Sequence, residues 1–124
     1  MFNCDPIDMH KLFKNLIENA VKYSDFKQKI EVKLYKENKN IVFSVKDYGI
    51  GIDISHQERI FERFYRIDKG RLEGGTGLGL AIVKHIVLKY KGKIDLQSKL
   101  GQGSVFTVKI PIFNESIFIK NILA

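Results

Sequence analysis

The chain lacks several features that mark large classes of proteins. It holds a single cysteine, Cys4, in 124 residues, so it can form no internal disulfide, and a reducing compartment fits. No apolar run approaches the roughly 20 residues that a membrane-spanning helix needs, and no secretory signal peptide is visible. No internal repeat or low-complexity segment is found. We therefore expect a soluble domain, which can still be a piece of an anchored protein.

Composition and charge fit one globular domain. Apolar residues make up 44% and charged residues 28% of a chain long enough for a single core but not for two. The excess of 21 Lys+Arg over 14 Asp+Glu gives a net charge of +7, which favours polyanionic ligands in general. The lysines are scattered along the chain and form no block, a pattern typical of a solvated surface. We expect no nucleic-acid partner.

Glycine is concentrated in residues 74–80, which read Gly-Gly-Thr-Gly-Leu-Gly-Leu. This segment lies between a basic, aromatic stretch (63–70) and an amphipathic run that begins at Ala81. Glycines at the entrance to a helix favour a phosphate cradle, because the backbone can approach a ligand and the helix dipole attracts an anion. Neither G-x-x-x-x-G-K-[ST] nor a strict G-x-G-x-x-G is present. A plain turn before the helix is the alternative interpretation.

The order of predicted elements indicates an α+β fold. Asp5 and Pro6 are typical of a helix start, and the apolar stripe that follows predicts a helix over 6–23. Further predicted elements are strands over 30–35 and 41–46, helices near 56–63 and from Ala81, and strands near 93–98 and 104–110. We expect a two-layer sandwich in residues 1–111, with helices on one face of a mostly antiparallel sheet. The tail, residues 112–124, has no assigned role.

The first predicted helix carries a second, polar stripe. Its members follow i, i+3, i+4, i+7 spacing and are Asn15, Glu18, Asn19 and Lys22. Asparagine is a poor helix former, so two in mid-helix favour a function. Amide oxygens for Mg²⁺, a carboxylate and a lysine are the groups that phosphoryl transfer uses. The alternative is a Glu18–Lys22 pair on a solvated face.

Asp47 is predicted to point inward at the end of its strand. Period-2 alternation puts it on the face of Phe43 and Val45, where a buried carboxylate must find donors. Gly49 and Gly51 keep the adjoining backbone slim, so the flat edge of a ligand with an amino group could reach Asp47. Alternatively, the carboxylate caps the turn that follows it.

Together these segments resemble the ATP-binding catalytic domain of bacterial sensor histidine kinases, in the superfamily of gyrase, chaperone and mismatch-repair ATPases. The matching segments, in the order of that family's N, G1, F and G2 boxes, are 15–24, 47–52, 60–66 and 74–84, followed by 101–106. The resemblance covers roughly residues 5–111 and implies a Bergerat-type two-layer fold with a mixed, mostly antiparallel sheet.

The resemblance also implies roles for single residues toward Mg²⁺ and ATP. Asn19 would hold Mg²⁺ with Asn15 beside the triphosphate, Glu18 would polarise the attacking group, and Lys22 would contact phosphate. Tyr23 would flank the nucleotide, Asp47 would accept from the adenine amino group, and the base pocket would be shaped by Gly49, Gly51 and Ile52. The phosphate cradle would comprise Gly75, Thr76, Gly77, Leu78 and Gly79, beneath a lid at 65–76. Phe61 and Phe64 would position that lid. Ser104 shares an alternation face with Phe106, Val108 and Ile110, so it could reach the base through water.

Two departures from the family pattern stand out. Tyr90-Lys-Gly92 replaces the usual His-Gly-Gly, which affects only a local turn. The chain also starts almost at the N box, and His10, His56 and His85 lack the context of a phosphoacceptor. The acceptor histidine is thus expected on a separate dimerisation domain of the same kinase, which would pass the phosphoryl group to a response regulator.

The resemblance further implies a cytoplasmic domain whose parent is anchored in the inner membrane, homodimeric at full length and monomeric as the isolated domain. Three alternatives remain. An anti-sigma-factor serine kinase shares the N and G boxes, but the Phe61/Phe64 box argues against it. A chaperone or mismatch-repair ATPase usually needs a longer lid and a transducer domain. A nucleic-acid-binding module would use the basic surface.

Overall fold

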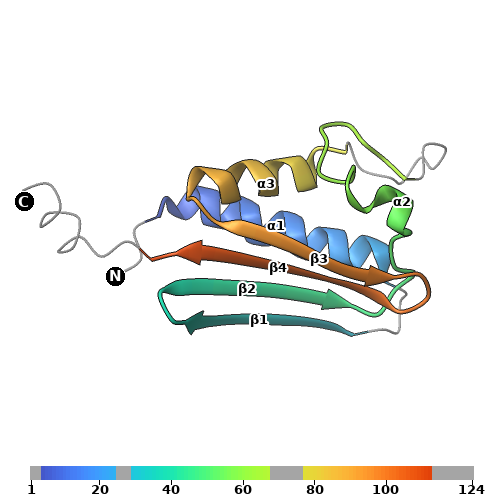
Figure 1. The fold of residues 1–124 in the computed structure, drawn as a ribbon, viewed down its shortest axis with the longest axis horizontal. Helices are drawn as coiled ribbons and strands as arrows, with labels where there is room; N and C mark the ends of the chain where they lie inside the picture. Colours follow the sequence, from blue (N-terminus) through green and yellow to red (C-terminus); the bar gives the residue numbers. More distant parts are fainter. Residues whose placement is uncertain (1–3, 25–28, 68–76, 113–124) are drawn as a thin grey trace, which may run out of the picture.

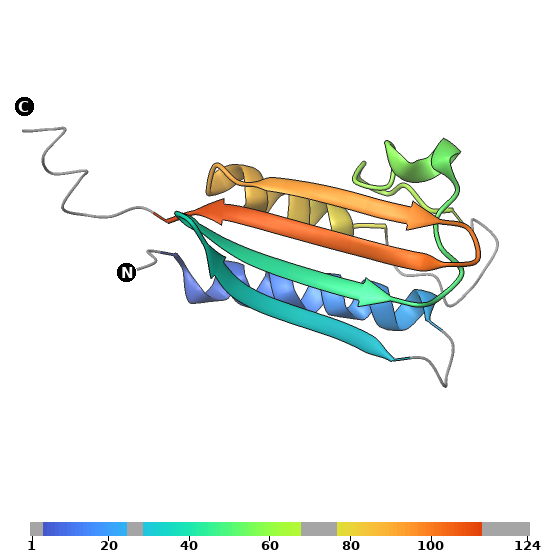
Figure 2. The same cartoon turned by 60° about the horizontal axis from the view of Figure 1, so that its bottom comes forward.

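A computed structural model describes residues 4–24, 29–67 and 77–112. The helices are α1 (Pro6–Tyr23), α2 (Ile54–Gln57) and α3 (Gly79–Lys89), and the strands are β1 (Ile30–Glu37), β2 (Asn40–Asp47), β3 (Lys93–Lys99) and β4 (Gly103–Pro111). The strands form one antiparallel sheet in the order β1-β2-β4-β3. Helices α1 and α3 lie side by side on one face of it, and α2 lies near one end (Figures 1 and 2). The predicted α+β two-layer fold is confirmed.

Helix α1 begins and ends as the sequence predicts. The Asp5 carboxylate accepts from the backbone N–H of Ile7 at 2.9 Å, and Pro6 takes the first helical position. The face turned to the sheet is apolar, and its buried residues are Met9, Leu12, Leu16 and Ala20. Because this stripe fixes the rotation of α1, the polar stripe turns away from the sheet and toward α3.

The two central strands supply most of the inner face of the sheet. Its buried residues on β2 and β4 are Phe43, Val45, Asp47, Ser104, Phe106, Val108 and Ile110. The antiparallel register pairs Asp47 with Ser104 at one end of these strands. The two polar side chains are therefore neighbours at the edge of an otherwise apolar core, which is the alternation predicted for both.

Two helix boundaries differ from the sequence prediction. Helix α2 covers 54–57 and not 56–63, because Asp53 caps it early and the chain continues in turns up to Phe64, whose φ of 68° is left-handed. Helix α3 starts at Gly79, before Ala81.

Tyr90 joins the far ends of α1 and α3. Its hydroxyl donates to the Asp8 carboxylate at 2.7 Å and accepts from the backbone N–H of Asp5 at 2.9 Å. The Lys89 ammonium donates to the same carboxylate oxygen at 2.8 Å. Hydrogen bonds from Lys89 and Tyr90 lower the pKa of Asp8. The departure from His-Gly-Gly thus coincides with a polar clamp between α1 and α3.

Candidate functional site

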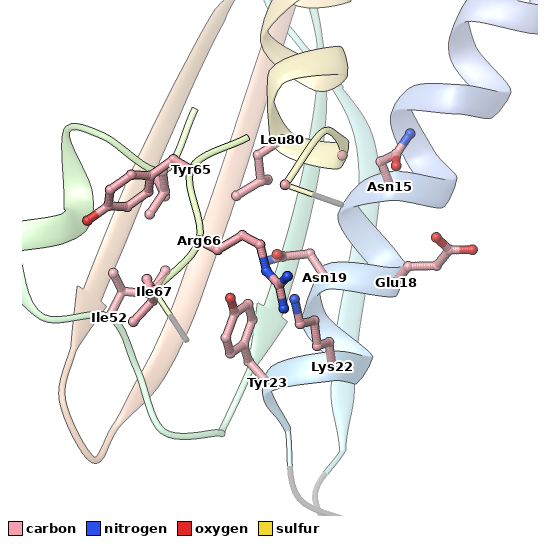
Figure 3. A pocket seen from close by; sticks show the side chains of 13 residues that line it. Asn15, Glu18, Asn19, Lys22, Tyr23, Ile52, Tyr65, Arg66, Ile67 and Leu80 are labelled. Carbon is pink, nitrogen blue, oxygen red and sulfur yellow. The ribbon is translucent and has the colours of Figure 1, made fainter. Parts of the chain in front are cut away.

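A cavity of about 200 Å³ opens between α1, the start of α3 and the segment after α2. Its lining comprises Asn15, Glu18, Asn19, Lys22, Tyr23, Ile52, Ile60, Tyr65, Arg66, Ile67, Gly77, Gly79 and Leu80. The polar stripe of α1 forms one wall, and Leu80 at the start of α3 lies across from it (Figure 3). Gly77 and Gly79 also line the cavity. The structure therefore brings together the N-box and G2-box residues that the sequence marked separately.

The side chains of the polar stripe differ in where they point. In Figure 3 Asn19, Lys22 and Tyr23 gather around the Arg66 guanidinium, whereas Glu18 projects from the outer side of α1. Glu18 forms an exposed ion pair with Lys14 at 4.0 Å. Asn19, Lys22 and Arg66 are thus the groups best placed to meet an anionic ligand inside the cavity.

Asn15 is oriented toward the start of α3. Its amide nitrogen donates to the Lys11 carbonyl at 2.7 Å, which leaves the amide oxygen turned away from its own helix. A Cβ added at Gly79 would lie 3.0 Å from that oxygen. A larger residue at position 79 would crowd the amide, so Gly79 keeps an oxygen ligand accessible between α1 and α3.

The amino end of α3 is suited to bind phosphate. Leu78 takes the cap position, and its apolar side chain supplies no capping oxygen to the first turn. Gly77, with φ of 75°, and Gly79 lie on the cavity wall beside it. The helix dipole and the first N–H groups of α3 favour an anion there.

Asp47 is buried, with 1% of its surface exposed, and does not itself line the cavity. One carboxylate oxygen accepts from the backbone N–H of Gly49 at 2.9 Å, so the turn-capping alternative is realised. Burial raises the pKa of Asp47, and hydrogen bonds from the backbone of Gly49 and Ser104 oppose that rise. A carboxylate can accept about four hydrogen bonds, so capacity remains for a ligand amine.

Gly49 and Gly51 are required by packing within the protein. A Cβ at Gly49 would lie 1.8 Å from the Tyr23 carbonyl oxygen, and one at Gly51 would lie 2.1 Å from that of Lys99. Gly51 also has φ of 75°. These contacts join the loop after Asp47 to α1 on one side and to the β3–β4 turn on the other. Their predicted role in shaping a base pocket stays a prediction.

A polar network missed by the sequence analysis supports Ile52, which lines the cavity. The Ser98 hydroxyl accepts from the Ile52 backbone N–H at 2.7 Å and lies 2.7 Å from the Ser104 hydroxyl. The Gln57 amide donates to the carbonyls of Ile52 and Ser98 at 2.8 and 3.1 Å. The alternation of Ile94, Leu96 and Ser98 on β3 could have indicated that Ser98 points inward.

The segment after α2 is held by aromatic contacts. Phe61 packs edge-on against Phe106 with ring centroids 6.1 Å apart, as expected of a packing residue, whereas Phe64 is 67% exposed. The Tyr65 hydroxyl bonds to His56 Nδ1. Most of the predicted lid at 65–76, with Gly75 and Thr76, lies outside the described residues. Arg66, which the sequence analysis did not select, lines the cavity beside the N-box residues.

The donor set fits Mg²⁺ shared with phosphates. Within 4–24, 29–67 and 77–112, no three His, Cys, Asp or Glu residues lie close enough to hold a metal ion by themselves. The cavity instead offers the amide oxygens of Asn15 and Asn19. Mg²⁺ commonly takes one or two protein oxygens and completes its shell with water and phosphate, so these residues fit the ion only together with a nucleotide.

Comparison with known proteins gives a consistent result. The profile of the histidine kinase-, DNA gyrase B- and HSP90-like ATPases matches residues 4–114. The chain is 43% identical over 111 residues to the sensor histidine kinase RppB of Synechocystis sp., covering 88% of this chain and 24% of the relative. It is 50% identical over 99 residues to the sensor-like histidine kinase SenX3 of Mycolicibacterium smegmatis, covering 78% and 26%. The chain thus spans about a quarter of the length of these curated relatives.

Solved structures show the same likeness. The mycobacterial sensor histidine kinase MprB superposes with a TM-score of 0.77 at 29% identity, over 88% of this chain and 73% of that one. Full-length ShkA in complex with AMPPNP gives a TM-score of 0.75 at 30% identity, over 85% and 21%. In the part of the chain that the structure describes, every helix is too short or too polar to cross a membrane.

Proposed function

Because the chain belongs to the family of histidine kinase-, DNA gyrase B- and HSP90-like ATPases, we propose that it binds Mg-ATP in the cavity between α1 and α3. We further propose that it delivers the γ-phosphoryl group to a histidine on a separate dimerisation domain of its parent kinase. The main observation behind this proposal is the cavity itself. There the face of α1 that bears Asn15, Asn19 and Lys22 meets the amino end of α3.

The proposed mechanism is mainly one of positioning and charge stabilisation. Lys22 on α1 and Arg66 in the segment after α2 contact the phosphates from one side. The amino end of α3 binds the phosphates from the other side. Asn19 and Asn15 hold Mg²⁺, which neutralises charge on the phosphates when bound. Gly77 and Gly79 let the backbone come close to the phosphates.

The base lies at the other end of the proposed site. Asp47 accepts from the adenine amino group, Tyr23 and Ile52 flank the base, and Ser104 takes part through water. The Tyr23 carbonyl is 3.4 Å from the backbone nitrogen of Ile50, which donates to it, so the loop that follows Asp47 is attached to α1. This attachment supports a base position between the two. Glu18, which lies on the outer side of α1, is proposed to face the incoming acceptor.

We propose that the parent kinase has further parts. Its dimerisation domain would present the histidine, the full-length protein would be a homodimer, and a response-regulator aspartate would receive the phosphoryl group. Membrane attachment would come from other parts of the parent, so that this domain works in the cytoplasm. The names of RppB and SenX3 support the sensor-kinase context.

Titration of the 124-residue chain with a non-hydrolysable ATP analogue, with and without Mg²⁺, tests the site. We expect Asp47→Asn to weaken binding at least tenfold, because its amide presents donors toward the adenine amino group. Asn19→Asp should change the Mg²⁺ dependence more than the preference for adenine. Lys93→Gln, on the outer face of the sheet, is a matched control. Unchanged binding in both site variants would overturn the assignment.

Phosphotransfer tests the reaction. The chain is mixed with labelled ATP and the dimerisation domain of the parent, and we expect the acceptor domain to become labelled. The label should be lost in acid, because a phosphoramidate hydrolyses there. An acid-stable phosphoester would instead support the serine-kinase alternative.

A further inference from the structure

Two serine hydroxyls, Ser98 on β3 and Ser104 on β4, face each other beside Asp47. The hydroxyl oxygens are 2.7 Å apart, and Ser104 is the register partner of both Ser98 and Asp47. Ser104 is buried, with 4% of its surface exposed. The pair therefore lies between the strand end that carries Asp47 and the loop that carries Ile52.

The contacts of Ser98 determine where the hydroxyl protons point. Its oxygen accepts from the Ile52 backbone N–H at 2.7 Å and lies 3.0 Å from the Gly103 carbonyl oxygen, which can only accept. A serine hydroxyl has one proton and two lone pairs. All three contacts are satisfied together only if Ser98 donates to Gly103 and accepts from both Ile52 and Ser104. Ser104 must then turn its proton toward Ser98.

We infer that Ser98 is a positioning residue for nucleotide specificity: it holds the Ser104 proton away from Asp47, so that Asp47 and Ser104 both present hydrogen-bond acceptors to the base. This inference rests on the proposed function, in which Asp47 receives the adenine amino group. The other proton arrangement would leave the Gly103 carbonyl without its hydroxyl donor and would free the Ser104 proton to turn toward its register partner Asp47.

An acceptor that faces the 6-position of the base favours adenine over hypoxanthine. Adenine carries an amino group at its 6-position, which donates to Asp47, whereas hypoxanthine carries a carbonyl there, which a carboxylate repels. If Ser98 no longer holds the Ser104 proton, that proton occupies an Asp47 lone pair or donates to a 6-carbonyl. Adenine then binds more weakly and hypoxanthine more tightly, so the ratio of their affinities decreases.

The test is a double-mutant cycle measured with Mg²⁺ complexes of ATP and of inosine triphosphate. The variants are Ser98→Ala, Ser104→Ala and the double variant of the 124-residue chain, with affinities from displacement of a fluorescent nucleotide. We expect Ser98→Ala to reduce the ATP-to-ITP affinity ratio about three- to tenfold, the effect of one hydrogen bond. In the Ser104→Ala background it should have no further effect on that ratio.

Further variants separate positioning from folding. Ser98→Thr keeps the hydroxyl and should retain the wild-type ATP-to-ITP affinity ratio. Ser98→Cys keeps the volume but is a weak acceptor, so it should give an intermediate ratio, and it can be measured even if Ser98→Ala unfolds. If Ser98→Ala changes the ATP-to-ITP affinity ratio equally in the wild type and in the Ser104→Ala background, the inference is overturned. That result leaves the proposed function standing if Asp47→Asn still abolishes the preference for ATP. If no variant loses the preference for ATP over inosine triphosphate, or if the wild type does not bind ATP, both the inference and the proposed function are overturned.

Discussion

The backbone N–H of Phe64 donates to the carbonyl oxygen of Gly77 at 2.9 Å, and both residues have left-handed φ values of 68° and 75°. A Cβ at Gly77 would lie 2.8 Å from the Phe64 carbonyl carbon. The two residues that flank the segment predicted as the lid, 65–76, are therefore hydrogen-bonded to each other beside the cavity.

Gly77→Ala should disturb this attachment. The added methyl meets the Phe64 backbone in a conformation already costly for alanine, so we expect more than 2 kcal/mol of destabilisation or a displaced loop, and at least tenfold weaker nucleotide binding. Gly101→Ala is the control, because Gly101 also has a left-handed φ, of 82°, but nothing lies within 4 Å of the added atom. It should cost about 1 kcal/mol and leave nucleotide affinity unchanged. Thermal unfolding and nucleotide titration measure both effects, and equal affinity losses would contradict the account.

The polar clamp of Tyr90, Lys89 and Asp8 should stabilise the fold without affecting nucleotide binding. Tyr90→Phe removes a hydroxyl that donates to Asp8 and accepts from Asp5, so we expect a loss of about 1 kcal/mol. Scanning calorimetry should show a melting temperature lower by about 5 °C. A large loss of ATP affinity in this variant would show that the clamp has another role.

The same clamp predicts a pH dependence of stability. The pKa of Asp8 is lower in the folded than in the unfolded state, so its contribution is present above the unfolded pKa and is lost as pH falls through the folded pKa. Asp8→Asn removes that contribution. The melting temperatures of wild type and Asp8→Asn should therefore differ at neutral pH and converge in acid, and a difference that persists at the lowest pH would contradict this assignment.

Asp47 should titrate in the opposite sense. Because burial raises its pKa, the folded state binds this proton more tightly than the unfolded state. Its contribution to stability is thus greatest below the unfolded pKa and is lost as pH rises through the raised folded pKa. Protonation also removes an acceptor, so affinity for ATP should fall on acidification at a pH above the ordinary aspartate range. Asp47→Asn binds ATP more weakly, but its affinity should not fall further on acidification in this pH range. A wild-type affinity for ATP that stays constant in the same range would contradict the proposed base contact.

The two phenylalanines of the F box should differ in their effect on stability. Phe61 packs on Phe106, so Phe61→Ala should cost about 2 kcal/mol. Phe64 is 67% exposed, and Phe64→Ala should change the free energy of unfolding by less than about 0.5 kcal/mol. Denaturant unfolding compares the two, and similar losses would contradict the described packing.

Periodicity in the sequence was sufficient to predict most of the fold. The Asp5-Pro6 start and apolar stripe predicted α1 to the residue, and alternation correctly turned Asp47 and Ser104 inward. The end of α2 at Gln57 was missed, and so was the left-handed turn at Phe64, where the backbone is hydrogen-bonded to Gly77, a residue distant in the sequence. Such tertiary contacts leave no periodic pattern.

The site was predictable only in part, for the same reason. Spacing on one helix places Asn15, Asn19 and Lys22 together, so those residues could be found from the sequence. Arg66 and Ser98 reach the site from other elements, and only the folded chain brings them near it. From the sequence, Gly49 was expected to make room for a ligand. In the structure, the closeness of the Tyr23 carbonyl is sufficient to explain why a glycine stands there.

The central claim is that Mg-ATP binds between α1 and α3, and amide chemical-shift mapping tests it most directly. On addition of a non-hydrolysable ATP analogue with Mg²⁺, we predict the largest shifts in residues 15–23, around Asp47 and Ser104, and at the start of α3. The outer face of the sheet, at Thr107 and Lys109, should be unaffected. Saturable shifts confined to that outer face, or none at millimolar nucleotide, would contradict the account.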